Sequence, residues 1–133
     1  MRKLRAAAFN VAFYVWTTTM LLVCLPVLAM PRPRMVVAMA FWAKGVMWLL
    51  DRLVGLSYEI RGRQHIPAGP CIFAAKHQSA WDTIVFHFAV PDPAVVMKRE
   101  LMRIPIYGWL ARRAGMIPVD REGVGAALKT MLK

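Results

Sequence analysis

The chain is organised around the stretch Cys71-Ile72-Phe73-Ala74-Ala75-Lys76-His77-Gln78-Ser79-Ala80-Trp81-Asp82. Its first five residues form a short apolar run after the turn-forming Ala68-Gly69-Pro70. Such a run is typical of a buried strand, and we expect the strand to end at the histidine. Ligands of open α/β sheets usually bind at the carboxyl ends of strands. His77 is therefore a candidate functional residue.

The residues after His77 predict the start of a helix. Ser79 is a favoured N-cap residue, so we expect a helix over residues 80–89 with Asp82 in its first turn, where the helix dipole favours a carboxylate. On one continuous helix, residues five positions apart would point about 140° away from each other. A turn between strand and helix removes this obstacle. Asp82 can then accept the proton on one imidazole nitrogen of His77 and leave the other nitrogen basic.

Three blocks of sequence resemble a known family. His77 and Asp82, in the form His-Xaa4-Asp, are similar to the signature of the glycerolipid acyltransferases, in particular the bacterial 1-acyl-sn-glycerol-3-phosphate acyltransferases. The family's Lys-Xaa-Glu-Leu and Gly-to-Arg blocks resemble two later stretches, which are Lys98-Arg99-Glu100-Leu101 and Gly115-Met116-Ile117-Pro118-Val119-Asp120-Arg121. The resemblance covers residues 57–133. A Glu-Gly-Thr-Arg type block, which the family also has, does not occur before Lys133, so we expect the chain to hold the N-terminal part of the domain.

The resemblance implies an enzyme that transfers a fatty acyl group to the free hydroxyl of 1-acyl-sn-glycerol 3-phosphate, giving phosphatidate in phospholipid biosynthesis. The donor would be acyl-CoA or acyl carrier protein, a co-substrate rather than a cofactor, and no metal is implied. His77 would be the general base, and Asp82 would orient it and stabilise the imidazolium. Lys98, Gly115 and Arg121 would bind the substrate.

Each of these residues also has a plainer interpretation. His77 could be a core histidine, and Asp82 could serve only to stabilise its helix. Lys98 could be a solvated lysine at the end of a strand, and Arg121 could form a surface ion pair with Asp120. A guanidinium at that position equally suits a phosphate, because its fork binds two oxygens at once.

Two other functions remain open. The chain could be a membrane-anchored lipid-binding or interaction module that has the fold but no activity, or an acyltransferase for another lysophospholipid. A metal site formed by His77, Asp82 and His87 is disfavoured because these residues lack a compact ligand pair.

Composition and charge indicate a membrane setting. The 133 residues are 59% hydrophobic, with a mean hydropathy of +0.45, whereas soluble domains have about 45–50% apolar residues. The net charge of +11 indicates an anionic partner. We expect bilayer phospholipid or a phosphate-bearing substrate rather than nucleic acid, for which the chain has no motif. Cys24 and Cys71 lie in apolar runs and predict buried thiols, not a disulfide framework.

The leader predicts two membrane-associated helices. Residues 6–31 carry no charge and exceed the roughly 20 residues needed to cross a bilayer, and also the 7–15-residue core of a signal peptide. Pro26 should end this helix, with a break at residues 31–34. The next apolar run, 35–50, is short and contains Lys44, Trp42 and Trp48, which predicts an amphipathic or re-entrant helix at the surface. We expect residues 1–52 to anchor residues 53–133 to the cytoplasmic side of a bacterial inner membrane.

Patterns after the leader predict an α/β fold. Residues 57–61, 71–75, 94–97 and 116–119 are typical of strands, and helices are expected at 80–89, 103–114 and 125–132. Strands and helices that alternate along a chain favour a largely parallel sheet. The sequence therefore predicts an acyltransferase-like α/β sandwich with a mostly parallel sheet, preceded by N-terminal membrane helices.

Overall fold

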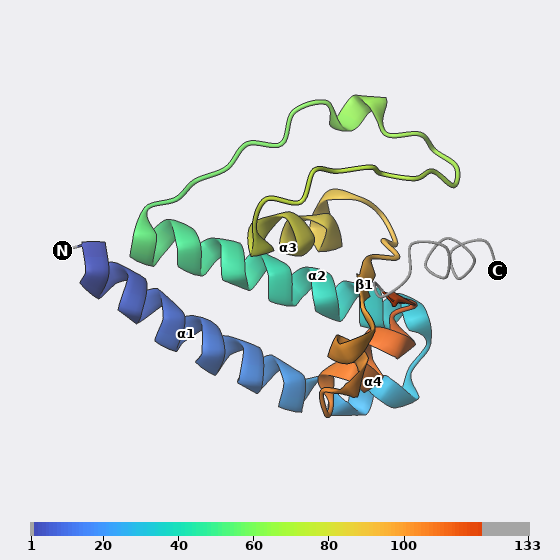
Figure 1. The fold of residues 1–133 in the computed structure, drawn as a ribbon, viewed down its shortest axis with the longest axis horizontal. Coiled ribbons are helices and arrows are strands. Elements are labelled where there is room, and N and C mark those ends of the chain that lie inside the picture. The colour runs from blue at the N-terminus through green and yellow to red at the C-terminus, as the bar shows by residue number, and fades with distance from the viewer. Residues whose placement is uncertain (1, 121–133) are drawn as a thin grey trace.

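The computed structural model describes residues 2–120 of the chain (Figure 1). In chain order, its helices and strands are α1 (Arg2–Val23), α2 (Arg32–Leu49), α3 (Ala80–Ala89), β1 (Val96–Lys98), α4 (Tyr107–Arg113) and β2 (Ile117–Val119). Short 3₁₀ helices occur at Leu25–Ala29, Arg63–His65 and Arg99–Arg103, and a π-helical turn at Leu50–Val54 extends α2.

Two long helices form an antiparallel hairpin, and the other elements pack against it. Figure 1 shows α1 and α2 side by side, with α3 on α2, and with α4 and β1 near the turn of the hairpin. The two strands pair in parallel, with Val96 opposite Ile117 and Lys98 opposite Val119. The described residues thus contain helices and a parallel strand pair, which agrees with an α/β fold.

The hairpin turn lies slightly earlier than predicted. α1 ends at Val23, and Pro26 lies at the start of the following 3₁₀ helix, as expected of a residue that stops helices. The break was predicted at residues 31–34, but α2 begins at Arg32 with Pro33 in its first turn. A proline is tolerated there because the first N–H groups of a helix have no intrahelical partner.

Both hairpin helices are long and apolar enough to cross a bilayer. The candidate spans are Lys3–Val23, with a mean hydropathy of 1.5, and Arg32–Val54, with a mean hydropathy of 1.2. The second is longer than the sequence suggested because the π-helical turn continues it. Their outward faces carry exposed large apolar side chains, among them Leu4, Val11, Val15 and Leu22 on α1 and Val37, Phe41 and Trp48 on α2. Such a surface is suited to contact with lipid.

Two tryptophans hold the hairpin together. The indole N–H of Trp16 donates to the Trp42 carbonyl at 3.0 Å, and the indole N–H of Trp42 donates to Thr17 Oγ1 at 3.1 Å. Gly45 makes the close approach possible, because a Cβ at this position would lie 2.4 Å from the Trp16 ring. Ala43 and Val46 are buried beside this contact.

Arginines tie the hairpin turn to the later part of the chain. Arg32 Nε donates to the Ala114 carbonyl at 3.0 Å, and another Arg32 nitrogen lies 2.5 Å from an Asp92 oxygen. Arg113 donates two hydrogen bonds to the Met30 carbonyl, at 3.1 and 2.6 Å. One hydrophobic cluster joins the same parts, and it contains Met20, Cys24, Met35, Met102, Leu110, Ala111, Ala114 and Met116. The leader and the residues after it therefore share a core.

Two predicted strands do not form. Residues 57–61 and 71–75 are irregular and largely exposed, and Ile72 is 96% exposed. A strand needs a neighbour for its backbone groups, and the described residues place none beside these segments. Aromatic contacts to α3 hold them instead, with Phe73 against Phe86 at 6.1 Å and Tyr58 against Trp81 at 6.0 Å between ring centroids.

One cysteine prediction changes with the missing strand. Cys71 is exposed rather than buried, because the strand that was to bury it is absent, whereas Cys24 is buried as predicted.

The remaining elements match the predictions within a few residues. α3 has the predicted bounds, and β1 and β2 lie within the predicted strands or one residue beyond them. α4 is shorter than the predicted 103–114 because Ile104 precedes Pro105 and is extended, as residues before proline usually are. The predicted helix at 125–132 lies outside the described residues.

We predict that Gly45→Ala lowers the free energy of unfolding by about 1–3 kcal/mol in detergent micelles. Alanine is intrinsically the better helix residue, by about 0.5–1 kcal/mol, but its Cβ would displace the Trp16 ring and break the bond to Trp42. Gly69→Ala is the matched control, since nothing lies within 4 Å of a Cβ there. Denaturant titration of both variants checks this, and equal stability of the two would contradict it.

Candidate active site

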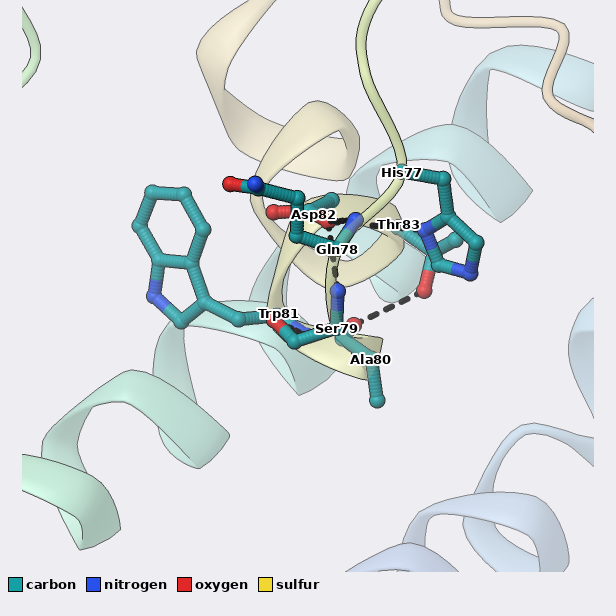
Figure 2. Close-up of polar contacts among 7 residues, drawn as sticks. All are labelled: His77, Gln78, Ser79, Ala80, Trp81, Asp82 and Thr83. Carbon is teal, nitrogen blue, oxygen red and sulfur yellow. Dashed lines mark hydrogen bonds and ion pairs between the residues drawn. The ribbon is translucent and has the colours of Figure 1, made fainter.

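The start of α3 is built by a capping box (Figure 2). Ser79 Oγ accepts a hydrogen bond from the Trp81 N–H at 3.2 Å. Asp82 Oδ2 accepts from the Ser79 N–H at 2.8 Å and from the Gln78 N–H at 2.5 Å. The N-cap prediction for Ser79 is confirmed, and the carboxylate of Asp82 folds back over the turn because the backbone N–H groups of Gln78 and Ser79 hold it there.

This turn brings His77 and Asp82 together. Nδ1 of His77 lies 3.4 Å from Asp82 Oδ2, somewhat longer than a 2.7–3.2 Å hydrogen bond. Figure 2 shows the imidazole with Nδ1 towards Asp82 and Nε2 on the far side of the ring. The His77 side chain is 61% exposed and that of Asp82 22% exposed. The arrangement leaves Nε2 accessible to a substrate, and it is not the environment of a core histidine.

The cap also sets the ionisation of Asp82. The backbone N–H groups of Gln78 and Ser79 lower the pKa of this carboxyl from its ordinary 3.8, and the nearby His77 acts in the same direction. Hydrogen bonds to a carboxylate favour its charged form. Asp82 is therefore an anion near neutral pH, and it can hold the Nδ1 proton of a neutral imidazole or stabilise an imidazolium.

Lys98 lies elsewhere, at the carboxyl end of β1. It pairs with Val119 in the sheet, and its Nζ is 3.8 Å from a Glu100 oxygen. The neighbouring Arg99 faces Asp120, with a nitrogen-to-oxygen distance of 3.5 Å. The two adjacent cations thus have different acidic neighbours.

Of the other two predicted substrate-binding residues, the structure describes only Gly115. Gly115 follows α4 with a φ of +80°, and its N–H donates to the Arg112 carbonyl at 3.0 Å. A Cβ there would also lie 2.8 Å from Arg32 Nε. The end of α4 and the close approach of Arg32 together explain a glycine at position 115, and no contact with a ligand is needed to explain it. Arg121 lies outside the described residues.

The described structure does not bring the His77–Asp82 pair, called the dyad below, and Lys98 into one site. Figure 1 shows the first turn of α3 at the end of that helix that lies away from β1. Among residues 2–120, no three His, Cys, Asp or Glu side chains lie close enough together to hold a metal ion. The role of Arg32 could not be found from the sequence, because its partners lie 60 and 82 residues away in the chain and leave no local pattern.

The described residues combine an apolar helical hairpin with an exposed His–Asp pair, an arrangement that suits activation of a hydroxyl group by a general base. The acyltransferase family model matches residues 57–133, and the chain belongs to this family.

Individual acyltransferases are also similar to the chain. The chain is 33% identical to a 1-acyl-sn-glycerol-3-phosphate acyltransferase of Pseudomonas aeruginosa, over 90% of the chain and 46% of that protein. It is 32% identical to the mouse 1-acyl-sn-glycerol-3-phosphate acyltransferase alpha, over 92% of the chain and 44% of that protein. A lyso-ornithine lipid O-acyltransferase of P. aeruginosa is 31% identical over 56% of the chain and 28% of that protein. No solved structure matches the chain. The chain thus spans less than half the length of these relatives.

The lowered pKa of Asp82 predicts how acid affects the start of α3. A carboxyl whose pKa is lower in the folded state stabilises that state fully above its unfolded pKa, near pH 4, and loses this contribution as the pH falls through the folded pKa. Asp82→Asn should therefore lower the free energy of unfolding at pH 7, and the difference from the parent should shrink below about pH 4.

Denaturant titrations in detergent at several pH values measure this difference. Asp51→Asn is the control, because the described residues place no side-chain hydrogen bond on that exposed carboxylate. A difference for Asp82→Asn that does not change between pH 7 and pH 3 would show that the cap does not depend on the charge.

Proposed function

We propose that the protein transfers a fatty acyl group from a thioester of coenzyme A or acyl carrier protein to the free hydroxyl of lysophosphatidate, giving phosphatidate. The observation that carries this proposal is the exposed His77 with Nδ1 towards an ionised Asp82. The names of the relatives that cover most of the chain support the acceptor.

The proposed chemistry needs a base. The pKa of an alcohol lies far above 7, so its proton must be removed as the oxygen attacks the thioester carbonyl. His77 Nε2 takes this proton while the Nδ1–H stays directed at Asp82, whose negative charge stabilises the imidazolium. Collapse of the tetrahedral intermediate breaks the carbon–sulfur bond, and the thiolate leaves as a thiol with the proton from His77. No acyl-enzyme forms, and neither cysteine takes part.

We propose Lys98 and Arg121 for the substrate phosphate on the resemblance of their sequence blocks to those of the family, although β1, which carries Lys98, lies apart from the first turn of α3 in the described structure. Val119 pairs with Lys98 and is two residues before Arg121, so the chain leaves β2 at the strand edge where Lys98 lies. A lysine supplies a point charge and an arginine supplies a planar fork, and both suit phosphate oxygens. Gly115 ends α4, and a contact between it and the substrate stays a prediction.

A second acceptor is supported by one relative. The lyso-ornithine lipid O-acyltransferase resembles part of the chain, and that protein's name refers to a different lysolipid. The same dyad chemistry would acylate either acceptor, because both reactions require only a deprotonated hydroxyl. Acyl transfer compared on lysophosphatidate, a lyso-ornithine lipid and a neutral monoacylglycerol distinguishes the acceptors, and an inactive lipid-binding module would acylate none of them.

We also propose that the hairpin holds the dyad at the cytoplasmic surface of a bacterial inner membrane. The exposed apolar faces of α1 and α2 support a membrane location. The acyl thioesters that would serve as donors are water-soluble cytoplasmic molecules, which is why we place the site on that side. α3 packs on α2, so the site is carried by the membrane element itself.

His77→Ala should lower the rate of acyl transfer at least ~10²-fold, the lower end of what a general base contributes. Asp82→Asn should lower it in the same direction, because an amide cannot stabilise the imidazolium. Rates with a labelled acyl thioester and lysophosphatidate in vesicles measure both effects.

Ser79→Ala is the matched control for Asp82→Asn. It removes the other half of the cap, at about 1 kcal/mol of stability, but leaves the carboxylate and His77 in place. It should keep most of the activity of the parent. A loss as large as that of Asp82→Asn would mean that Asp82 acts only as a cap, and near-normal turnover by His77→Ala would exclude the mechanism.

The hairpin predicts attachment that resists salt. Salt screens the interaction of basic side chains with anionic lipids but does not weaken hydrophobic insertion. The protein should therefore stay in the membrane pellet after a high-salt wash and leave it only with detergent. Release by salt alone would show that the hairpin is not inserted.

A further inference from the structure

A shallow groove of about 390 Å³ lies between α2 and the end of α3, away from the dyad. Its α2 wall consists of Val36, Val37, Ala40 and Lys44, and its other wall is formed by Arg63 and residues 87–92. The groove therefore has a long apolar wall and two cationic side chains.

The two cations have no acidic partner in the described part of the chain. Among residues 2–120, no ion pair involves Lys44 or Arg63, and the Arg63 guanidinium donates one hydrogen bond, of 3.4 Å, to the Phe88 carbonyl. The one carboxylate in the lining, Asp92, is already paired with Arg32 at 2.5 Å. Two positive charges at a groove with no free counter-charge favour an anionic occupant.

The position of Lys44 on α2 indicates what kind of anion. Val37, Phe41, Lys44 and Trp48 recur at intervals of four, three and four residues, so they lie on one face of the helix. All four are exposed, and the three apolar members belong to the surface suited to lipid. Between Val37 and Trp48, Lys44 is thus the only charged residue, and an anion beside it would offset the cost of placing a lysine on an apolar surface that faces lipid.

The geometry points to a binding site for one anionic phospholipid, with its headgroup phosphate between Lys44 and Arg63 and an acyl chain along Val36, Val37 and Ala40. A free phosphate would use only the cations, and a neutral lipid would use only the wall. This site is independent of the proposed acyl transfer, because it shares no residue with the dyad. It would hold α2 at headgroup depth by a specific lipid contact in addition to hydrophobic insertion.

Photochemical labelling of the protein in neutral-detergent micelles tests the site. The probes are phosphatidylglycerol and phosphatidylcholine, each with a diazirine in one acyl chain, and the readout is the mass of the labelled peptide that contains residues 36–41. Phosphatidylglycerol should label this peptide roughly thirtyfold more than phosphatidylcholine, since two basic side chains near an anionic headgroup contribute about one kcal/mol each. Equal labelling by the two lipids, or no labelling of this peptide by either, would overturn the proposal.

Variants separate the groove from general charge. Lys44→Gln with Arg63→Gln should reduce the phosphatidylglycerol labelling by a similar factor, whereas Lys44→Arg with Arg63→Lys should retain it. Arg5→Gln with Arg103→Gln removes the same charge from exposed positions outside the groove, and labelling should be unchanged. An equal loss in both glutamine pairs would reduce the effect to non-specific attraction. Displacement of the lipid by millimolar glycerol 3-phosphate would show a phosphate site without a lipid contribution, and would also overturn the proposal.

Discussion

The Arg32 guanidinium joins three parts of the molecule that are far apart in the sequence. Arg32 is the first residue of α2. Its guanidinium donates to the Ala114 carbonyl at the end of α4 and pairs with Asp92 after α3. The last carbonyls of a helix have no intrahelical partner, so the bond to Ala114 also supplies one of the missing partners of α4. Gly115 permits this, since a side chain there would fill the space of the guanidinium. Without this contact, the hairpin turn and the β1–α4–β2 unit would be joined by their shared apolar cluster and by the hydrogen bonds from Arg113 to the Met30 carbonyl.

One oxygen atom of Asp82 both caps α3 and faces the imidazole of His77. Oδ2 receives two backbone N–H groups and faces the imidazole, while the other carboxyl oxygen has no such contacts among the described residues. The backbone donors fix the carboxylate in space and also keep it ionised, so the cap prepares the charge that the imidazolium would need. Stability and proposed chemistry are therefore coupled at this residue. Ser79 shares only the capping role, and this difference allows the two to be separated by experiment.

Local interactions were predictable from sequence, and distant ones were not. α3 follows from Ser79, Asp82 and the apolar residues after them, all within one helix, and its predicted bounds are those observed. The meeting of His77 with Asp82 is equally local. The strand expected at 71–75 depended on a neighbour that periodicity cannot identify, and aromatic contacts to α3 hold this segment instead. Likewise, no pattern around Arg32 reveals partners more than 50 residues away.

Packing on α2 gives the dyad a defined height on the membrane element. Trp81 and Ile84 of α3 contribute to the apolar cluster around Val46 and Met47, whereas His77 lies on the solvent side of the same turn. The imidazole is thus outside the contact between α3 and α2. A bilayer has polar headgroup layers of about 5–8 Å on each side of its ~30 Å core. If α2 lies at headgroup depth, a base at this height meets a lysophospholipid whose hydroxyl is close to the interface, so the acceptor need not leave the bilayer to react.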